Sequence, residues 1–381
     1  MNNKNVRLMY AIALLQGMIF YGPVATLYRQ AQGVSLFQIT IIESISLLVM
    51  IALEIPWGFV ADRIGYKKTL VICNALYFVS KIVFWQATGF AWFLAERLLL
   101  SVVLAGISGC DSAYLFIAAG EKDSHRVFGV YSAMGTAGLM VAAVVFSAVS
   151  ADNYRLAAFL TVVSYGVSMV LSFALGDPGI RAVRRSCFAN DAKAVISALK
   201  GNKRFFIFLI AAMLLAESNQ TITVFLSQVQ YVRAGIATKY MGYIYILMTL
   251  AGLTAALSGR FTNRIGESRA GKILFTAAAI ACAVTAVTAD PLLSVLLIVL
   301  LRLSASMFAP ISMSVQNRQI NIAARATLLS VYSCIMNTGA IFTNLVFGRL
   351  ADISVSLALG MGAAFCLAGL ILYSVWARKA A

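Results

Sequence analysis

Apolar residues run along this chain in long stretches, and short polar joints separate one stretch from the next. A helix needs about 20 mostly apolar residues to cross a hydrocarbon core of roughly 30 Å. The lengths of the stretches therefore predict an all-α membrane protein with twelve transmembrane helices. The predicted spans are residues 8–28, 36–58, 69–88, 90–119, 126–149, 155–174, 204–232, 240–259, 270–288, 291–316, 326–347 and 355–376.

Composition agrees with a lipid environment. Hydrophobic residues fill 61% of the 381 positions and charged residues only 12%, so a soluble domain of this length would lack polar surface. The net charge of +16 could indicate binding to nucleic acid, but the basic residues are distributed by loop parity. We therefore expect membrane lipids, and no nucleic acid, as partners.

The 30 Lys and Arg residues predict the orientation in the membrane. Because cytoplasmic loops carry an excess of basic residues, the termini and the even-numbered loops, which hold most of them, are expected in the cytoplasm. This orientation fits a bacterial-type cytoplasmic membrane. The exceptions are five residues in odd-numbered loops (Arg29, Arg155, Arg233, Lys239, Arg349) and three within spans (Lys81, Arg97, Arg302).

A long polar interval divides the spans six and six. We expect an N-terminal bundle of residues 1–175, a cytoplasmic linker of residues 176–203 and a C-terminal bundle of residues 204–381. The linker suits either a short helix on the membrane surface, beginning at Asn190 or Asp191, or a solvated tether.

Internal repeats support this division. The spacing of Gly58, Asp62, Arg63 and Gly65 recurs as Gly259, Asn263, Arg264 and Gly266, and Arg97 with Ser101 recurs as Arg302 with Ser306. Two six-helix bundles in the same orientation, related by a pseudo-twofold axis, are typical of a transporter whose site lies between its halves.

Residues 58–70 are expected to form a basic, glycine-containing loop between two apolar runs, and this loop resembles a motif of the major facilitator superfamily. The family pattern is Gly, three residues, Asp-Arg, one residue, Gly and two basic residues, and the matching positions are Gly58, Asp62, Arg63, Gly65, Lys67 and Lys68. Tyr66 stands where the first basic residue usually lies. The resemblance implies a twelve-span secondary transporter similar to multidrug exporters.

The same resemblance implies a conformational latch formed by these six residues, which we call the latch motif. Asp62 would face the amino end of span eleven in the outward-open state, where the helix dipole favours an anion. Asn263 carries no charge, so the latch is expected in one half only. A tight turn with cytoplasmic lysines is the competing interpretation, and it leaves Asp62 unexplained.

Span five lacks the family's antiporter signature, a Gly-Pro pair followed by glycines. Gly129, Gly135 and Gly138 occur there without a proline. Close packing of helices through small residues is therefore the favoured interpretation of these glycines.

Ionisable residues within the spans are functional candidates because they are costly in lipid unless they are paired or face water. Glu43, Lys81, Glu96 and Arg97 are expected roughly 9 to 18 Å from the outer surface, where they could form one layer of ion pairs. Lys81 could instead extend its side chain to the interface.

Two further polar faces are predicted on helices. Helical spacing in span four places Arg97, Ser101, Ser108, Asp111 and Ser112 within about 60° of one face. In span seven, the spacing gives one face to Glu217, Gln220, Thr221 and Gln228. Hydrogen bonding between spans is the alternative role of the span-seven residues. Arg302 of span ten is expected near the midplane.

These residues predict a transporter that exports a small amphipathic compound in exchange for protons. Glu217, Asp111 and Glu43 would supply negative charge, with Gln220 beside them. The alternative substrate is a carboxylate or another organic anion held by Arg97 and Arg302. A transport-dead sensor of the same fold is a further alternative.

Other classes of protein fit the sequence poorly. One histidine and dispersed acids offer no catalytic constellation, so we expect no enzyme. Residues 266–273 resemble a phosphate-binding loop, but Ile273 replaces the required hydroxyl. The six cysteines are scattered without a CxxC pair, so we expect free thiols, no metal and no cofactor. A monomer is expected.

Overall fold

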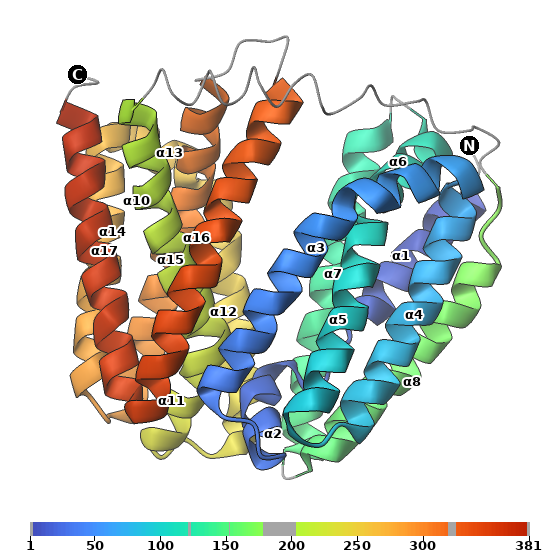
Figure 1. Ribbon diagram of the computed structural model, residues 1–381, viewed down its shortest axis with the longest axis horizontal. Coiled ribbons are helices and arrows are strands. Elements are labelled where there is room, and N and C mark those ends of the chain that lie inside the picture. Colours follow the sequence, from blue (N-terminus) through green and yellow to red (C-terminus); the bar gives the residue numbers. More distant parts are fainter. Residues whose placement is uncertain (1–2, 121–122, 152, 178–202, 319–324, 379–381) are drawn as a thin grey trace. The chain divides into compact units, whose positions relative to one another are not determined.

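The structure is a computed structural model that describes residues 3–120, 123–151, 153–177, 203–318 and 325–378. Within these ranges every regular element is helical (Figure 1). Eleven helical segments there are long and apolar enough to cross a membrane. A further helix of 29 residues, α16 (Arg325–Ile353), lies at the position of the eleventh predicted span. The prediction of an all-helical membrane protein is thus confirmed.

The chain divides into two compact units, Met1–Arg185 with Thr238–Ile246, and Ser186–Ala237 with Leu247–Ala381. The linker residues 178–202, with the helix expected near Asn190, lie outside the described ranges. The elements before the linker are α1 (Asn3–Gly17), η1 (Gly22–Val24), α2 (Ala25–Ala31), α3 (Leu36–Ile64), α4 (Tyr66–Gln86), α5 (Gly89–Ile107), α6 (Cys110–Ala119), α7 (Ser124–Val145), η3 (Phe146–Ser150) and α8 (Tyr154–Phe173).

The second half of the chain continues the helical order. Its elements are α10 (Lys203–Gln220), η4 (Thr221–Leu226), α11 (Ser227–Arg233), η5 (Thr238–Tyr240), α12 (Met241–Leu253), η6 (Thr254–Leu257), α13 (Ser258–Ile265), α14 (Glu267–Val287), α15 (Pro291–Arg318), α16 and α17 (Val355–Arg378). Each predicted span of this half corresponds to one helix or to a run of consecutive helical elements, and the ends of the predicted spans differ from those of the helices by a few residues.

Five predicted spans are not continuous α-helices. The first is broken between α1 and α2, and the fourth is broken at Gly109, whose φ of 81° suits glycine. The fifth runs from α7 into the π-helical segment η3, and the seventh contains a π-helical segment, η4. The eighth contains the 3-10 segment η6. Apolar length predicts where a span lies, but it does not register such local changes of helical phase.

Helix α3 continues through residues 58–64, the first part of the latch motif, so the loop expected over those residues is wrong. A capping box begins the helix, because Ser35 Oγ accepts a hydrogen bond from the Gln38 amide while the Gln38 side chain accepts from the Ser35 amide. The helix ends at Gly65, where φ is 88°. Gly266 ends α13 with a φ of 86°, so the internal repeat is also a repeat of local structure.

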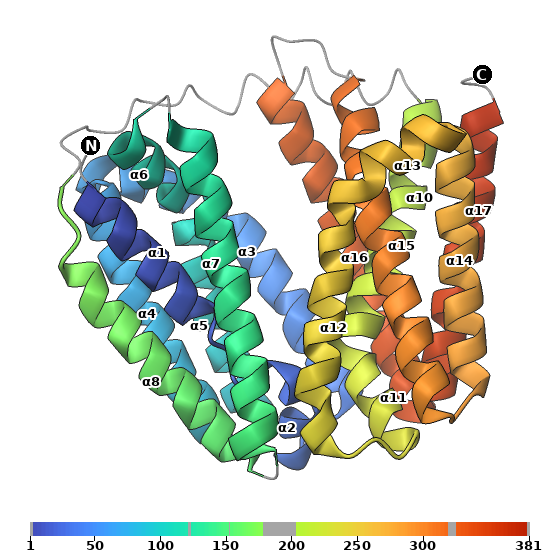
Figure 2. The ribbon, with the colours of Figure 1, turned by 180° about the vertical axis from the view of Figure 1, so that it is seen from behind.

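Hydroxyl groups of α8 complete the end of α1 in the first unit, where the two helices pack together (Figure 2). Ser164 Oγ donates to the Leu15 carbonyl at 2.7 Å, and Tyr165 Oη donates to the Gln16 carbonyl at 2.6 Å. The last carbonyls of a helix lack the usual donor four residues further on. The Leu15 carbonyl also accepts from the Met18 amide at 3.1 Å, and the two side chains complete the bonding where span one breaks.

Glycines allow α1 and α7 to pack backbone against backbone. A Cβ atom added at Gly138 would collide with the Leu14 carbonyl oxygen, and one at Gly17 would collide with that of Gly135. A Cβ atom added at Gly129 would meet no atom within 4 Å. The predicted role in close packing is confirmed for the contact that involves Gly135 and Gly138, and it is wrong for Gly129.

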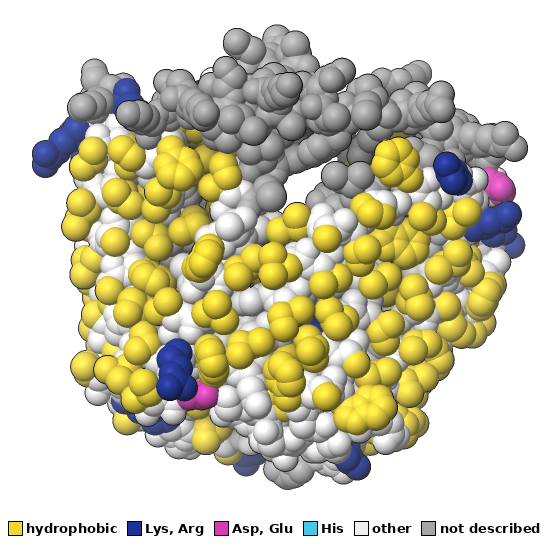
Figure 3. Space-filling view, viewed as in Figure 1, with side chains coloured by type: hydrophobic (Ala, Val, Ile, Leu, Met, Phe, Trp, Pro, Cys, Tyr) yellow, Lys and Arg dark blue, Asp and Glu magenta, His cyan; other side chains and the backbone are white. Residues whose placement is uncertain are grey.

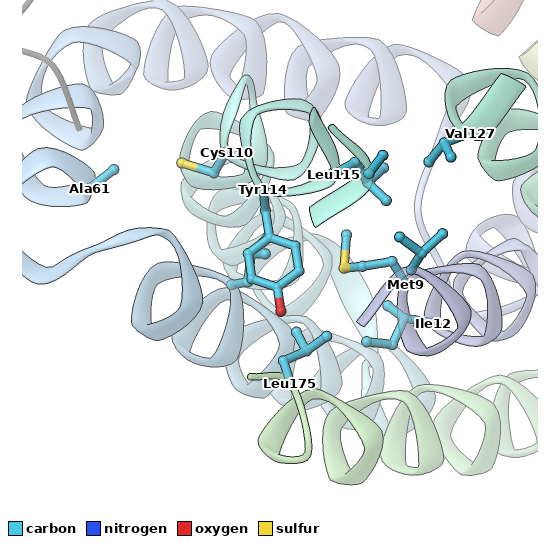
Figure 4. Close-up of a cluster of buried hydrophobic side chains, with 11 residues drawn as sticks. Met9, Ile12, Ala61, Cys110, Tyr114, Leu115, Val127 and Leu175 are labelled. Carbon is cyan, nitrogen blue, oxygen red and sulfur yellow. The ribbon is translucent and has the colours of Figure 1, made fainter. Parts of the chain in front are cut away.

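Each unit has its own apolar core. Figure 4 shows the cluster in the first unit, where Met9, Ile12, Tyr114 and Leu115 come from α1 and α6. The Tyr114 hydroxyl donates to the Gly176 carbonyl at 2.8 Å, so the polar end of this side chain is also satisfied. The core of the second unit includes stacked and edge-on aromatic rings from α10, α14, α15 and α17 (Phe208, Phe275, Phe308, Tyr373 and Trp376).

The flanks of the helices are apolar and exposed. Figure 3 shows hydrophobic side chains spread over them, while the visible Lys and Arg side chains lie mainly toward helix ends. Val287 is 82% exposed, Leu292 is 68% exposed and Ile371 is 64% exposed. Surfaces of this kind are stable in contact with lipid and not in contact with water.

Candidate functional site: buried charges of the two units

The first unit contains an ion pair between Arg97 of α5 and Glu43 of α3. The Arg97 side chain is 24% exposed and the Glu43 side chain 9%. Next to this pair on the same helices, Ser46 and Ser101 share a hydrogen bond of 2.7 Å. Two residues of the expected layer of ion pairs are therefore partners, and the positive charge of Arg97 is compensated.

A second ion pair joins Lys81 of α4 to Glu96 of α5, with 3.8 Å between Nζ and Oε1. Their side chains are 3% and 1% exposed. The predicted pairing of outer-half charges is confirmed by these two ion pairs. Extension of Lys81 to the interface is wrong, because the side chain is enclosed by protein.

Three tyrosine rings surround the Lys81 ammonium group. Nζ lies 5.8 Å from the ring centre of Tyr21, 5.2 Å from that of Tyr77 and 5.3 Å from that of Tyr165. It also donates a hydrogen bond of 3.1 Å to the Tyr21 hydroxyl. Rings at these distances attract a cation through their quadrupoles. Sequence reasoning missed these tyrosines, because they come from three separate spans and form no local motif.

Asp111 lies in the first turn of α6, beyond the break at Gly109. Its Oδ1 accepts from the Ser112 amide at 2.6 Å, and Tyr131 of α7 donates to its Oδ2 at 3.5 Å. The expected common face of Arg97 and Asp111 is wrong, since the break changes the helical phase between them.

The latch motif covers the last turns of α3, the turn at Gly65 and the first turn of α4. Arg63 and Lys68 are exposed, and Lys67 is partly buried. The surroundings of Gly58 and the Asp62 side chain lie outside the described part of the structure. The role of Asp62 as a latch stays a prediction.

In the second unit, Glu217 of α10 is partly buried, and no hydrogen bond or ion pair reaches it within the described ranges. Gln220 is exposed, whereas Thr221 and Gln228 are buried. Thr221 donates to Asn344 Oδ1 of α16 at 3.3 Å, and Gln228 donates to the Val224 carbonyl at 3.1 Å.

The expected single polar face of span seven is therefore wrong. The π-helical segment η4 follows Gln220 directly and alters the phase of the residues after it. Hydrogen bonding between spans, the alternative prediction, describes Thr221. Glu217 and Gln220 precede η4, so their relative spacing is unaffected.

Arg302 of α15 is partly buried and lies beside Gly252, close to the position that a Cβ atom would take there. Among the described residues it has no carboxylate partner, in contrast to Arg97. The two arginines occupy repeated positions in the sequence, yet their electrostatic surroundings differ.

The repeat of the latch motif at residues 259–266 lines a pocket of about 700 Å³. Arg260, Asn263 and Arg264 supply its polar side chains, and apolar walls come from Leu257, Phe261 and Met307. Cys73, Cys110, Cys282 and Cys366 form no disulfide among the described residues, whereas Cys187 and the Cys334 side chain lie outside the described part of the structure. Over the described residues, no cluster of three His, Cys, Asp or Glu side chains could hold a metal ion.

Solved structures share this fold at low sequence identity. The structure of the nucleoside transporter NupG aligns over 98% of this chain and 99% of the NupG chain, with a TM-score of 0.84 and 17% sequence identity. A bacterial homologue of the iron transporter ferroportin in an inward-facing state covers 98% of both chains, with a TM-score of 0.72 and 16% identity. At this identity the similarity establishes the fold alone.

A shorter sequence match links the chain to the methyl viologen resistance protein SmvA of Salmonella typhimurium strains 14028s and LT2. The identity is 28% over 96 residues, which is 24% of this chain and 19% of SmvA. The match thus covers about a fifth of the curated relative.

The sequence model of the Major Facilitator Superfamily matches residues 8–342, which is most of the chain. That match, together with the shared fold, confirms the resemblance drawn from the motif at Gly58 to Lys68 and identifies a transporter family rather than an enzyme family. This chain belongs to the Major Facilitator Superfamily.

Proposed function

We propose that the protein exports a small amphipathic organic cation across the cytoplasmic membrane in exchange for protons. Two six-helix bundles, residues 1–175 and 204–381, would give alternating access to the substrate, with both termini in the cytoplasm and a monomer as the working unit. The short match to a methyl viologen resistance protein is consistent with this direction of transport.

The uneven pairing of buried charges carries the proposal. Arg97 and Lys81 each have a carboxylate partner, whereas Glu217 has no cationic partner among the described residues. A partly buried carboxylate without a partner is suited to bind either a proton or a cationic solute, and competition between the two couples their transport. We assign Glu217 this role, with Gln220 and Asp111 as further contacts.

Glu43 and Arg97 would contribute as a pair, because each neutralises the other. Opening this pair would expose a carboxylate to solute or to protons in a second conformation. The latch motif would limit how readily the bundles change conformation, with Asp62 as its charged residue.

The alternative substrate is an organic anion. Arg302 favours it, since this guanidinium has no carboxylate partner in the described part of the chain. Arg97 weakens it, since a bound anion would have to displace Glu43. Both possibilities use the same fold and differ in the sign of the transported charge.

Flux into proteoliposomes with an acidic lumen tests the proposal, with tetraphenylphosphonium as the cation and benzoate as the anion. For one proton exchanged per solute, one pH unit drives about a tenfold concentration ratio. We expect this accumulation for the cation, and we expect Glu217→Gln to abolish it. Glu267→Gln is the matched control, because Glu267 pairs with Arg318 at an exposed site.

Three results would contradict the proposal. Accumulation of benzoate alone would support the anion transporter. Full cation exchange by Glu217→Gln would remove Glu217 from coupling. Binding of either solute without any flux would support a transport-dead sensor.

A further inference from the structure

Buried polar side chains connect α4 and α8 inside the first unit. Asn74, Lys81, Tyr165 and Ser168 are each at most 4% exposed. Ser168 donates to Asn74 Oδ1 at 3.2 Å, and the Tyr77 and Tyr165 hydroxyls are hydrogen-bonded. The ion pair between Lys81 and Glu96 belongs to this group, and no role has been given to it so far.

The Glu96 carboxyl group is short of hydrogen-bond donors. Its side chain is 1% exposed, and Oε1 lies 3.8 Å from Lys81 Nζ, which is longer than a hydrogen bond. Oε2 is buried and has no hydrogen-bond partner among the described residues. Leaving a carboxylate oxygen buried and unbonded is costly, whereas a proton bound to that oxygen would remove the negative charge.

Lys81 has two alternative partners. Its ammonium group now bonds to the Tyr21 hydroxyl at 3.1 Å and is attracted by the rings of Tyr21, Tyr77 and Tyr165. A shift of about 1 Å toward Glu96 would shorten the 3.8 Å contact to a charge-assisted hydrogen bond. The Lys81 ammonium group thus lies between a neutral partner, the Tyr21 hydroxyl with the tyrosine rings, and a charged partner, the Glu96 carboxylate.

We propose that Glu96 is a proton-binding residue of the transport cycle and that Lys81 is the cation that exchanges with the proton. When Lys81 stays with Tyr21 and the rings, hydronium gives up a proton, which forms an O–H bond with Glu96 Oε2 and leaves a water molecule. When Lys81 moves onto Glu96, that O–H bond breaks and the proton returns to water as hydronium. No other group gains or loses a proton in this exchange.

Other charged and titratable groups also face this site. Arg29 of α2 stacks over Phe84 and Phe93, at 5.6 and 5.9 Å from the ring centres, and acts electrostatically on Tyr21 together with Glu96. Arg97, on the same helix as Glu96, is paired with Glu43. The phenols are those of Tyr21, Tyr77 and Tyr165. Because Glu43 is engaged by Arg97, Glu96 is the carboxylate available to Lys81 within the described residues.

The inference rests on the proposed proton coupling, but proton binding is measurable without any substrate. Infrared difference spectra between high and low pH, recorded on the full chain in proteoliposomes, report carboxyl groups that gain a proton. We expect the wild-type protein to show a pH-dependent C=O band of protonated carboxyl that Glu96→Gln lacks. Glu96→Asp should retain a shifted band, which controls for folding. Glu267→Gln should match the wild-type protein.

Lys81→Met removes the exchanging cation without removing bulk. We expect its C=O band of protonated carboxyl to persist at the high pH at which the wild-type band is lost, because Glu96 then has no cation to replace the proton. Wild-type pH dependence of the band in Lys81→Met, or an unchanged band in Glu96→Gln, overturns the inference.

Flux separates this inference from the proposed function. In Glu96→Gln, exchange of tetraphenylphosphonium at equal pH should continue, while the roughly tenfold accumulation per pH unit should be lost. If wild-type protein shows the expected infrared bands but no accumulation, the proton site stands and the proposed function fails. If Glu96→Gln accumulates the cation like wild type, Glu96 is not a coupling residue and the inference fails.

Discussion

Arg97 of α5 and Glu43 of α3 form an ion pair in the interior of the first unit. Removing one member leaves the other charge without its partner in a largely dry environment, which costs about 1 to 3 kcal/mol. We predict that Arg97→Gln and Glu43→Gln each lower the stability of the full chain by that amount. Thermal unfolding in detergent measures the effect.

The double variant Glu43→Gln/Arg97→Gln tests whether the two charges interact. We expect it to lose less stability than the sum of the single variants, because no unpaired charge remains. Strictly additive losses would show that the pair contributes no coupling energy.

The contact between α1 and α7 predicts graded effects of adding one methyl group. Gly138→Ala would press a Cβ atom into the Leu14 carbonyl, and such overpacking costs about 1 to 3 kcal/mol. Gly129→Ala is the matched control on the same helix, where the space is open. Unfolding temperatures of the two variants check the prediction, and equal temperatures would contradict the close packing.

Tyr165 gives a third prediction. Its hydroxyl bonds to the Gln16 carbonyl at 2.6 Å, so Tyr165→Phe leaves a buried carbonyl without that donor. We expect a loss of about 1 to 3 kcal/mol in thermal unfolding. Tyr243→Phe, at a side chain that is 52% exposed, should change stability little. A similar loss in both variants would point to a general effect of removing hydroxyl groups.

The latch motif gives a kinetic prediction. Asp62→Asn removes the charge that is proposed to face a helix amino end, and this should slow solute exchange while leaving equilibrium solute binding unchanged. Flux and binding of tetraphenylphosphonium measure the two quantities. Asn263→Ala, at the equivalent position of the second copy, should exchange at the wild-type rate if the latch acts in one half only.

The sequence predicted the positions of the spans well, because apolar length is a direct requirement of the bilayer. It also placed Glu43, Lys81, Glu96 and Arg97 at one depth, and the two ion pairs follow from that layer. Depth alone did not decide which acid pairs with which base. That choice depends on the rotation of α3, α4 and α5 about their axes, which packing determines.

The errors have a common physical cause. Helical spacing assumes 100° per residue, and the assumption fails where Gly109 adopts a positive φ and where η4 is π-helical. Polar residues on the two sides of such a point no longer share a face. The glycines and basic residues at positions 58–68 suggested a loop, yet only Gly65 leaves the helical conformation.

Helix α1 is synthesised before α8, but the hydroxyl groups that bond its Leu15 and Gln16 carbonyls belong to α8. Leu15 and Ser164, like Gln16 and Tyr165, are 149 positions apart. The Leu15 carbonyl also accepts from the Met18 amide, but no backbone donor is seen for the Gln16 carbonyl among the described residues. Because an unbonded carbonyl is costly in hydrocarbon, the Gln16 carbonyl needs water or the insertion machinery beside it until α8 has been translated. Maturation of this unit in the membrane is therefore expected to finish only after its last helix is inserted.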